Sequence, residues 1–169
     1  MSLYEETREL HHACEKHPLG QLMVKGMITP QQWASWLSAL WDIHEVIDQI
    51  LPRHMHRGPL FHADFAMLYE DFRVNPDNSK AARAFAIRLE DENEMMGACY
   101  VLHGAHRRGG RAMQPVVTKA GLPCCHLFYA DPKAAETMIV SMRGRSELVQ
   151  PATNTFSALL RVMDEVYYA

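Results

Sequence analysis

The strongest constraint on how this chain folds is an apolar stripe with helical spacing between Thr29 and Pro52. The residues of the stripe recur every three or four positions: Trp33, Trp36, Leu37, Leu40, Trp41, His44, Ile47 and Leu51. Residues with that spacing share one face of an α-helix, so the stripe must face a core. Thr29-Pro30-Gln31-Gln32 supplies an N-cap, a proline for the first turn and a capping-box glutamine. The sequence therefore predicts a long, core-facing helix that ends before Pro52.

Most of the remaining chain has the same periodicity, and no run of residues alternates as a strand would. A first helix carries Leu3, Thr7, Leu10, His11 and Cys14 on one face, and His17-Pro18 stops or bends it. Further helices are predicted over residues 18–25, 60–72, 80–122, 132–147 and 151–168. A chain of 169 residues is large enough for one core and too short to require two. We expect an all-α helical bundle, a single domain over residues 1–169.

Composition excludes several classes of function. The formal net charge of -3 argues against a nucleic-acid surface. No apolar run approaches the roughly 20 residues that a membrane span needs, and the acidic N-terminus is unlike a signal peptide. The four cysteines, Cys14, Cys99, Cys124 and Cys125, have no CxxC spacing and are expected to be reduced thiols. We expect a cytoplasmic protein, a monomer or weak dimer, that binds neither nucleic acid nor membrane.

Histidine is the compositional oddity, with ten residues in the chain, and His11 has the most suggestive neighbours. Thr7, Arg8, Cys14 and Glu15 lie three or four positions from His11 and so share its helix face. A histidine that binds a metal through one ring nitrogen needs an acceptor for the other, and Glu15 is one turn away. The spacing fits equally a histidine at the core edge paired with a surface carboxylate.

Glycines interrupt the helical pattern between Gly97 and Gly110. Each glycine in a helix interior lowers the stability of the helix by about 1 kcal/mol relative to alanine, so these glycines are expected to serve a purpose. Glycine lets a flat ligand approach the helix axis, and it lets a helix flex over that ligand. Close packing between two helices explains small residues equally well.

Together these two segments resemble a known family. Glu6-Thr-Arg-Glu-Leu-His11-His-Ala-Cys-Glu15 is similar to the proximal-histidine helix of the short, biliverdin-producing heme oxygenases of bacteria and phages. Residues 17–33 and 40–44 resemble the family's second and third helices, and Tyr100-Val-Leu-His-Gly104 with Gly109-Gly110 resembles its distal helix. The similarity spans residues 6–51 and 94–115, with a fainter match near Arg143 and Phe156.

The resemblance implies a helical bundle with heme held between a proximal and a distal helix. Heme is then cofactor and substrate, with its iron bound by His11 and its ring opened to biliverdin, carbon monoxide and ferrous iron. Molecular oxygen and an external electron donor, a ferredoxin or reductase, are the implied partners. The resemblance places Gly104, Gly109 and Gly110 on the distal side. It implies that Thr7, Glu15 and Phe156 lie at the heme site and that Arg8 and Arg143 bind the heme propionates. The two arginines fit ordinary surface charge equally well, and Phe156 fits an ordinary core position.

Two departures from the family pattern carry predictions. Some members have an aspartate after the glycine that matches Gly104, where this chain has Ala105, so proton delivery must be organised differently. The second glycine follows Gly104 by five residues, whereas the family has four. Because five α-helical steps turn the second glycine away from the first, we predict a one-residue π-bulge or a break between Gly104 and Gly110. A bulge would let His106 or Arg107 turn toward the distal side and hold water; an undisturbed helix is the alternative.

Two other functions remain open from the sequence. A non-heme di-iron oxidase on a related helical scaffold needs paired Glu-x-x-His motifs, and only Glu9-Leu-His-His12 matches. A heme carrier or sensor would use the same pocket without turnover, which the alanine at position 105 makes conceivable.

Overall fold

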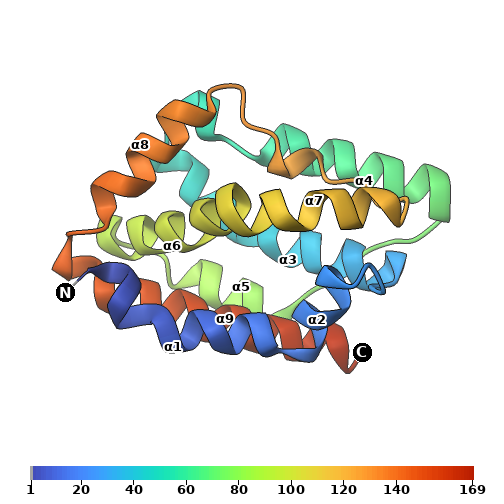
Figure 1. The fold of residues 1–169 in the computed structure, drawn as a ribbon, viewed down its shortest axis with the longest axis horizontal. Coiled ribbons are helices and arrows are strands. Elements are labelled where there is room, and N and C mark those ends of the chain that lie inside the picture. Colours follow the sequence, from blue (N-terminus) through green and yellow to red (C-terminus); the bar gives the residue numbers. More distant parts are fainter. Residues whose placement is uncertain (1) are drawn as a thin grey trace.

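The computed structural model describes residues 2–169, and every regular element in that range is helical, as the sequence predicts (Figure 1). The α-helices are α1 (Leu3–Lys16), α2 (Pro18–Val24), α3 (Pro30–Ile47), α4 (Gly58–Phe72), α5 (Lys80–Ile87), α6 (Glu92–Gly104), α7 (Gly110–Lys119), α8 (Pro132–Met142) and α9 (Val149–Tyr167). A π-helical segment, η3 (Ala105–Gly109), joins α6 to α7. Short 3-10 turns occupy η1 (Asp48–Ile50), η2 (Arg53–Met55), η4 (Cys125–Leu127) and η5 (Ser146–Leu148).

Side-chain caps fix where several helices begin. Ser2 with Glu5 and Thr29 with Gln32 form complete capping boxes at the starts of α1 and α3. Ser79 accepts a hydrogen bond from the backbone N–H of Ala82 at the start of α5. The chain leaves α2 through Gly26, whose φ of 65° lies in the left-handed region that favours glycine.

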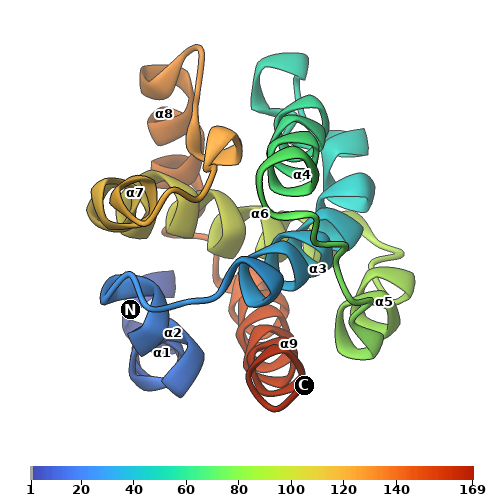
Figure 2. The same ribbon diagram turned by 90° about the vertical axis from the view of Figure 1, so that its right-hand side faces the viewer.

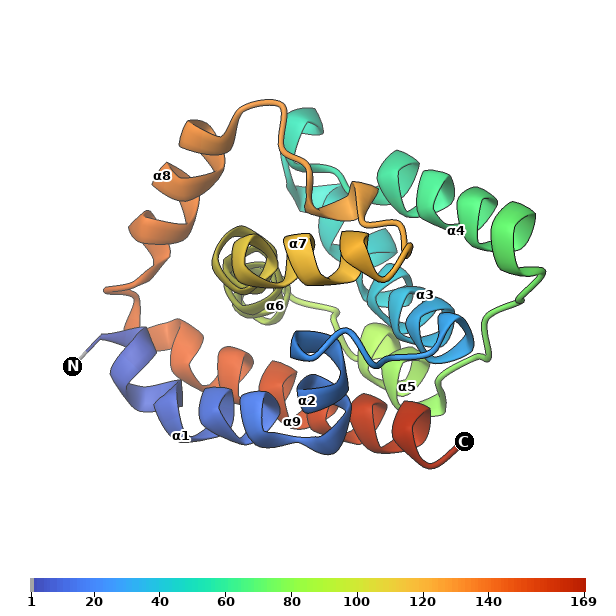
Figure 3. The same ribbon diagram turned by 45° about the vertical axis from the view of Figure 1, so that its right-hand side comes forward.

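The long C-terminal helix α9 forms the base of the bundle and packs against α1, α5 and α6 (Figure 2). Helix α3 crosses the molecule and packs against α4, α5 and α9. The segment running from α6 through η3 to α7 lies above α1, α2 and α9 in Figure 3. Within it, α6 packs against α9 and α7 packs against α2. The predicted stripe faces the core, and three of its members, Trp33, Leu37 and Ile47, are each 0% exposed. Among the described residues, no helix is long and apolar enough to cross a membrane.

Two of the predicted helices have different bounds in the structure. The single helix expected over residues 80–122 is broken between Ile87 and Glu92, because the side chain of Asp91 accepts from the Glu94 N–H and caps a new helix there. The helix expected over residues 132–147 ends at Met142. Gly144 follows, and the side chain of Arg145 pairs with Glu147 at 2.8 Å across the 3-10 turn.

Gly97 shows that one of the helix-interrupting glycines serves packing rather than a ligand. A β-carbon on Gly97 would overlap the Cβ of Pro151 and lie 2.8 Å from that residue's carbonyl carbon, at the crossing of α6 and α9. We predict that Gly97→Ala lowers the free energy of unfolding by about 1–3 kcal/mol, because the backbone of α9 must move. Chemical denaturation of the heme-free protein measures this; an unchanged midpoint would contradict the tight crossing.

Candidate functional site

His11 lies on α1 with one edge of its ring turned outward. Its side chain is 42% exposed, yet its Nδ1 atom is buried and has no hydrogen-bond partner. The exposed edge is therefore the one that carries Nε2. The rings of Phe156 on α9 and Tyr4 on α1 meet His11 edge-on, at centroid distances of 6.0 and 6.4 Å. The imidazole is thus held between two aromatic rings with one nitrogen available to a ligand.

Glu15 lies beside His11 but is hydrogen-bonded to its neighbour. The Nδ1 atom of His12 and Oε2 of Glu15 are 2.9 Å apart, whereas His11 Nδ1 and Oε1 of Glu15 are 3.7 Å apart. The predicted hydrogen bond from His11 to Glu15 is therefore not formed in this structure, since 3.7 Å is too long. Of the two histidines next to the Glu15 carboxylate, the exposed His12 is the one that is hydrogen-bonded to it.

The other predicted residues of α1 and its surroundings differ in what they offer a ligand. Thr7 is 2% exposed, and its hydroxyl donates to the carbonyl of Leu3 at 2.8 Å. Arg8 is exposed and has no ion-pair partner among residues 2–169. The backbone carbonyl of Arg143 accepts from the Leu3 N–H at 2.8 Å, which ties the end of α8 to the start of α1. Arg8 therefore lies on α1 and Arg143 lies beside its first residue, while the hydroxyl of Thr7 is already hydrogen-bonded.

Glu136 on α8 holds two exposed arginines in this structure. Its carboxylate lies 3.0 Å from the guanidinium of Arg108 on η3 and 3.8 Å from that of Arg143. Both pairs are partly exposed, so they are weak and exchange readily with other anions.

The five residues Ala105–Gly109 form a π-helix, which confirms the predicted bulge between Gly104 and Gly110. A β-carbon at Gly104 or at Gly109 would meet no atom within 4 Å. A π-turn contains one residue more than an α-turn, so residues five positions apart lie about one turn apart. Gly104 and Gly109 therefore share one side of this segment, and both border open space. Gly110 differs: it is buried, and a β-carbon there would lie 2.8 Å from Cδ2 of Leu127. The structure brings Gly104 and Gly109 together and turns Gly110 into the packing with η4.

The side chains of His106 and Arg107 face the interior rather than the side left open by the glycines. His106 is 5% exposed and stacks on His44, with their Nε2 atoms 3.0 Å apart. The guanidinium of Arg107 lies 5.4 Å from the ring centre of Tyr129. The expectation that the bulge turns one of them toward the distal side fails for His106, which is buried against His44. Arg107 is half-buried, and its Nε has no hydrogen-bond partner.

A buried polar cluster behind the π-helical segment was not predicted from the sequence. Burial lowers the pKa of His44, and it lowers the pKa values of His103 and His106 well below the usual value. These imidazoles are therefore neutral at pH 7. The whole cluster, defined here as the interior polar cluster, comprises His44, Asp48, Arg57, Asp64, His103, His106, His126 and Tyr129.

Arg57 and Asp64 bind this cluster to the surrounding backbone. Arg57 is 1% exposed and donates to the carbonyls of Met55 and His126, and its guanidinium stacks 3.8 Å from the ring centre of Tyr129. Asp64 is 0% exposed and pairs with Nδ1 of His126 at 2.6 Å. The sequence placed His44 in an apolar stripe. Its neighbours His103 and His106 lie about 60 residues further along the chain, so no local sequence pattern could identify them.

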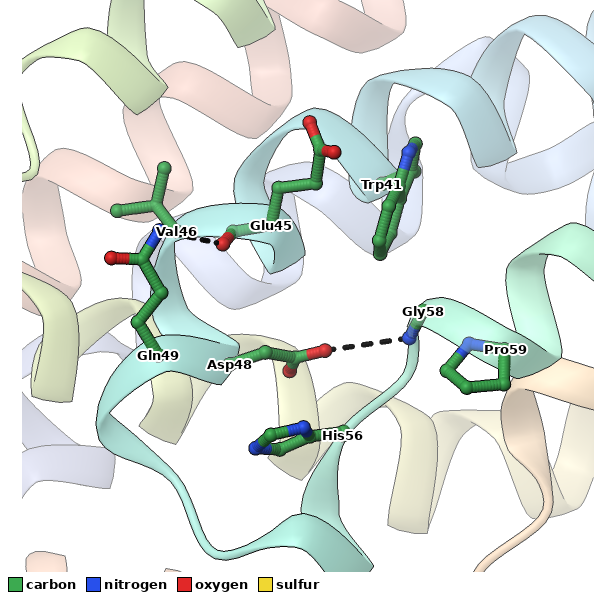
Figure 4. A pocket seen from close by; sticks show the side chains of 8 residues that line it. All are labelled: Trp41, Glu45, Val46, Asp48, Gln49, His56, Gly58 and Pro59. Atoms are coloured by element: carbon green, nitrogen blue, oxygen red, sulfur yellow. Dashed lines mark hydrogen bonds between the residues drawn. The ribbon is translucent and has the colours of Figure 1, made fainter.

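An open hollow of about 620 Å³ borders the cluster at the junction of α3 and α4 (Figure 4). The carboxylate of Asp48 reaches toward the backbone N–H of Gly58, at 3.3 Å, between the rings of Trp41 and His56. The residues lining the hollow are Trp41, Glu45, Val46, Asp48, Gln49, His56, Gly58 and Pro59. None of them belongs to the predicted site around His11, so this hollow is a separate feature.

Solved structures resemble this chain over almost its whole length, although its sequence matches no family model and no curated protein. Heme oxygenase-1 from the cyanobacterium Synechocystis, in complex with heme, has a TM-score of 0.82 at 15% identity, covering 96% of this chain and 89% of that one. Heme oxygenase-2 from Synechocystis, in complex with heme and NO, has a TM-score of 0.80 at 15% identity, covering 97% and 83%. Heme oxygenase from Leptospira interrogans has a TM-score of 0.80 at 17% identity, covering 98% and 100%. The chain therefore has the all-helical fold of the heme oxygenases.

Proposed function

We propose that this protein is a heme oxygenase, which uses oxygen and electrons to convert heme to biliverdin, carbon monoxide and ferrous iron. The observation that carries the proposal is the outward-facing edge of His11 on α1, with Nδ1 buried and Nε2 available. The fold shared with heme-bound structures supports the same function.

The residues around His11 fit heme. An imidazole with one nitrogen turned inward and the other accessible suits axial ligation. Gly104 and Gly109 leave open space where β-carbons would otherwise project, as a flat ligand lying against a helix requires. When bound, the heme supplies the iron at which oxygen is activated and the meso carbon that is oxidised.

The chain's own residues would position the ring. His11 would hold the iron through Nε2, and the ring of Phe156 on α9 contacts the imidazole edge-on. The backbone at Gly104, the last residue of α6, and at Gly109 in η3 would pack against the ring. This packing would decide which meso carbon is oxidised.

Arg8 and Arg143 are the residues proposed to bind the propionates. Arg8 lies on α1 and Arg143 lies beside the first residue of that helix. Guanidinium groups pair with carboxylates through two parallel hydrogen bonds. Binding at Arg143 would displace the 3.8 Å contact with Glu136, which is solvent-exposed and costs little to break.

An external ferredoxin or reductase is the proposed electron donor. We expect the protein to act in the cytoplasm as a monomer or weak dimer. Ala105 supplies no carboxylate for distal water, and this observation favours a second candidate function, a heme carrier or sensor that performs no turnover.

Addition of reductant and oxygen to the purified heme complex distinguishes these functions. A heme oxygenase loses its Soret band and gains the absorption of biliverdin. A carrier keeps its Soret band through the same treatment. Metal analysis tests the di-iron alternative, which requires two non-heme iron atoms per chain and no heme.

Glu15→Gln tests whether Glu15 tunes the bound iron. We predict that heme binds His11 within about threefold of the wild-type affinity. The iron–histidine stretching frequency and the reduction potential should nevertheless change, because the Glu15 carboxylate lies 3.7 Å from Nδ1 of His11 and groups near that nitrogen influence how the imidazole binds iron. Resonance Raman spectroscopy and a redox titration measure these; the same values in both proteins would remove Glu15 from the site.

A further inference from the structure

We propose that His44, Asp48 and His103 bind one divalent transition-metal ion inside the bundle. The three residues form what we call the interior triad. This site is distinct from the heme site around His11, and the proposal does not depend on heme turnover.

Three potential ligand atoms converge in the triad. One ligand atom from each residue lies within 4.8 Å of the other two, and the unpaired atoms are His44 Nδ1, Asp48 Oδ1 and His103 Nε2. Each is buried and has no hydrogen-bond partner. The atoms of His44 and Asp48, one turn apart at the end of α3, are 3.6 Å apart, too far for a hydrogen bond. Because buried polar atoms almost always have partners, the convergence of these three indicates a bound species between them.

The opposite end of each side chain is fixed by another group. His44 Nε2 lies 3.0 Å from His106 Nε2, and His103 Nδ1 lies 2.5 Å from the hydroxyl of Tyr129. The second carboxylate oxygen of Asp48 accepts from the backbone N–H of Arg57 at 2.8 Å. Metal ligands in proteins typically have such outer hydrogen bonds, which fix the tautomer and orientation of each histidine.

The donor set selects the class of ion. Two neutral imidazole nitrogens and one carboxylate oxygen suit Zn²⁺ or Fe²⁺ and leave coordination positions open. Mg²⁺ and Ca²⁺ prefer sites made of oxygen atoms. The nearby cation does not occupy the site, because the guanidinium of Arg57 donates to the backbone carbonyls of Met55, His126 and Phe128.

The hollow at the junction of α3 and α4 gives the ion a route inward. Asp48 belongs both to the triad and to the lining of this hollow (Figure 4). An ion entering from solvent would therefore meet the Asp48 carboxylate before it reaches the two histidines.

A competitive titration of the heme-free protein, residues 1–169, tests the site, with Zn²⁺ against a chromophoric chelator. His11, His12 and Glu15 form a second group with metal-binding spacing at the surface, so the experiment uses the His11→Ala/His12→Ala variant as its background. We expect one equivalent of Zn²⁺ to bind and to raise the melting temperature. Fe²⁺ under anaerobic conditions should compete, and Mg²⁺ should not.

Two conservative substitutions in that background remove one ligand each. Asp48→Asn keeps an oxygen for the backbone N–H groups, and His103→Asn keeps an amide near the Tyr129 hydroxyl while removing Nε2. Each should weaken Zn²⁺ binding at least about a hundredfold, since a ligand is lost outright. Unchanged Zn²⁺ affinity in both folded variants would overturn the proposal. Absence of Zn²⁺ binding by the folded background protein would also overturn it, and would indicate that water fills the space between the three ligand atoms.

X-ray absorption at the zinc edge gives a readout that does not require the variants to fold. In the His11→Ala/His12→Ala protein it should show two imidazoles and oxygen donors. A spectrum with sulfur ligands, or with fewer than two imidazoles, would contradict the triad.

Discussion

His11→Ala is expected to abolish the histidine-ligated heme spectrum and to reduce heme turnover at least about a hundredfold, because no other residue of the site offers an axial nitrogen in the same place. His11 combines a buried Nδ1 with an exposed opposite edge. Optical and resonance Raman spectra of the ferric and ferrous complexes measure the ligation directly.

His12→Ala is the matched control. His12 is the adjacent residue and is similarly exposed, at 51%, but its Nδ1 atom is hydrogen-bonded to Glu15. The control should keep the wild-type heme spectrum. Loss of that spectrum in His12→Ala together with its retention in His11→Ala would show that the wrong histidine has been assigned.

Gly104→Leu is expected to weaken heme binding about a hundredfold while leaving the heme-free fold intact. A β-carbon at Gly104 meets no atom within 4 Å, so the first atom of a side chain there overlaps nothing. Its backbone has ordinary helical angles, φ -60° and ψ -45°. Leucine should therefore raise the free energy of unfolding by up to about 1 kcal/mol, and the same side chain would occupy the space proposed for heme.

Heme titration and chemical denaturation of the same variant measure these two opposite effects. Gly97→Ala, on the same helix, serves as the comparison because it should destabilise the fold. Wild-type heme affinity in a stable Gly104→Leu protein would place the ligand elsewhere.

The helices were predictable because their signals are local. The spacing of the α3 stripe and the capping boxes at Ser2 and Thr29 each act within a few residues. The π-helical segment was predictable from the family resemblance: the family pattern has its two glycines four positions apart, whereas Gly104 and Gly109 are five apart, which an α-helix cannot place on one face. The break before α6 was missed because the cap at Asp91 carries no signal stronger than the helical residues on either side of it.

The interior polar cluster was not predictable from local pattern. His44 follows the spacing of a core stripe, and only the fold brings it to His103 and His106 on another helix. Arg57 and Asp64 gave no signal, since their partners are mostly backbone groups of distant segments. The role of Glu15 was predicted by spacing alone, and spacing does not decide between His11 and His12 as its partner.

Product analysis of a single turnover tests the central claim most directly. The heme complex is supplied with oxygen and electrons, the pigment is separated by chromatography, and carbon monoxide is captured and quantified. The proposed function predicts one equivalent each of biliverdin and carbon monoxide per heme consumed. Heme recovered intact, or bleached without carbon monoxide, would contradict it.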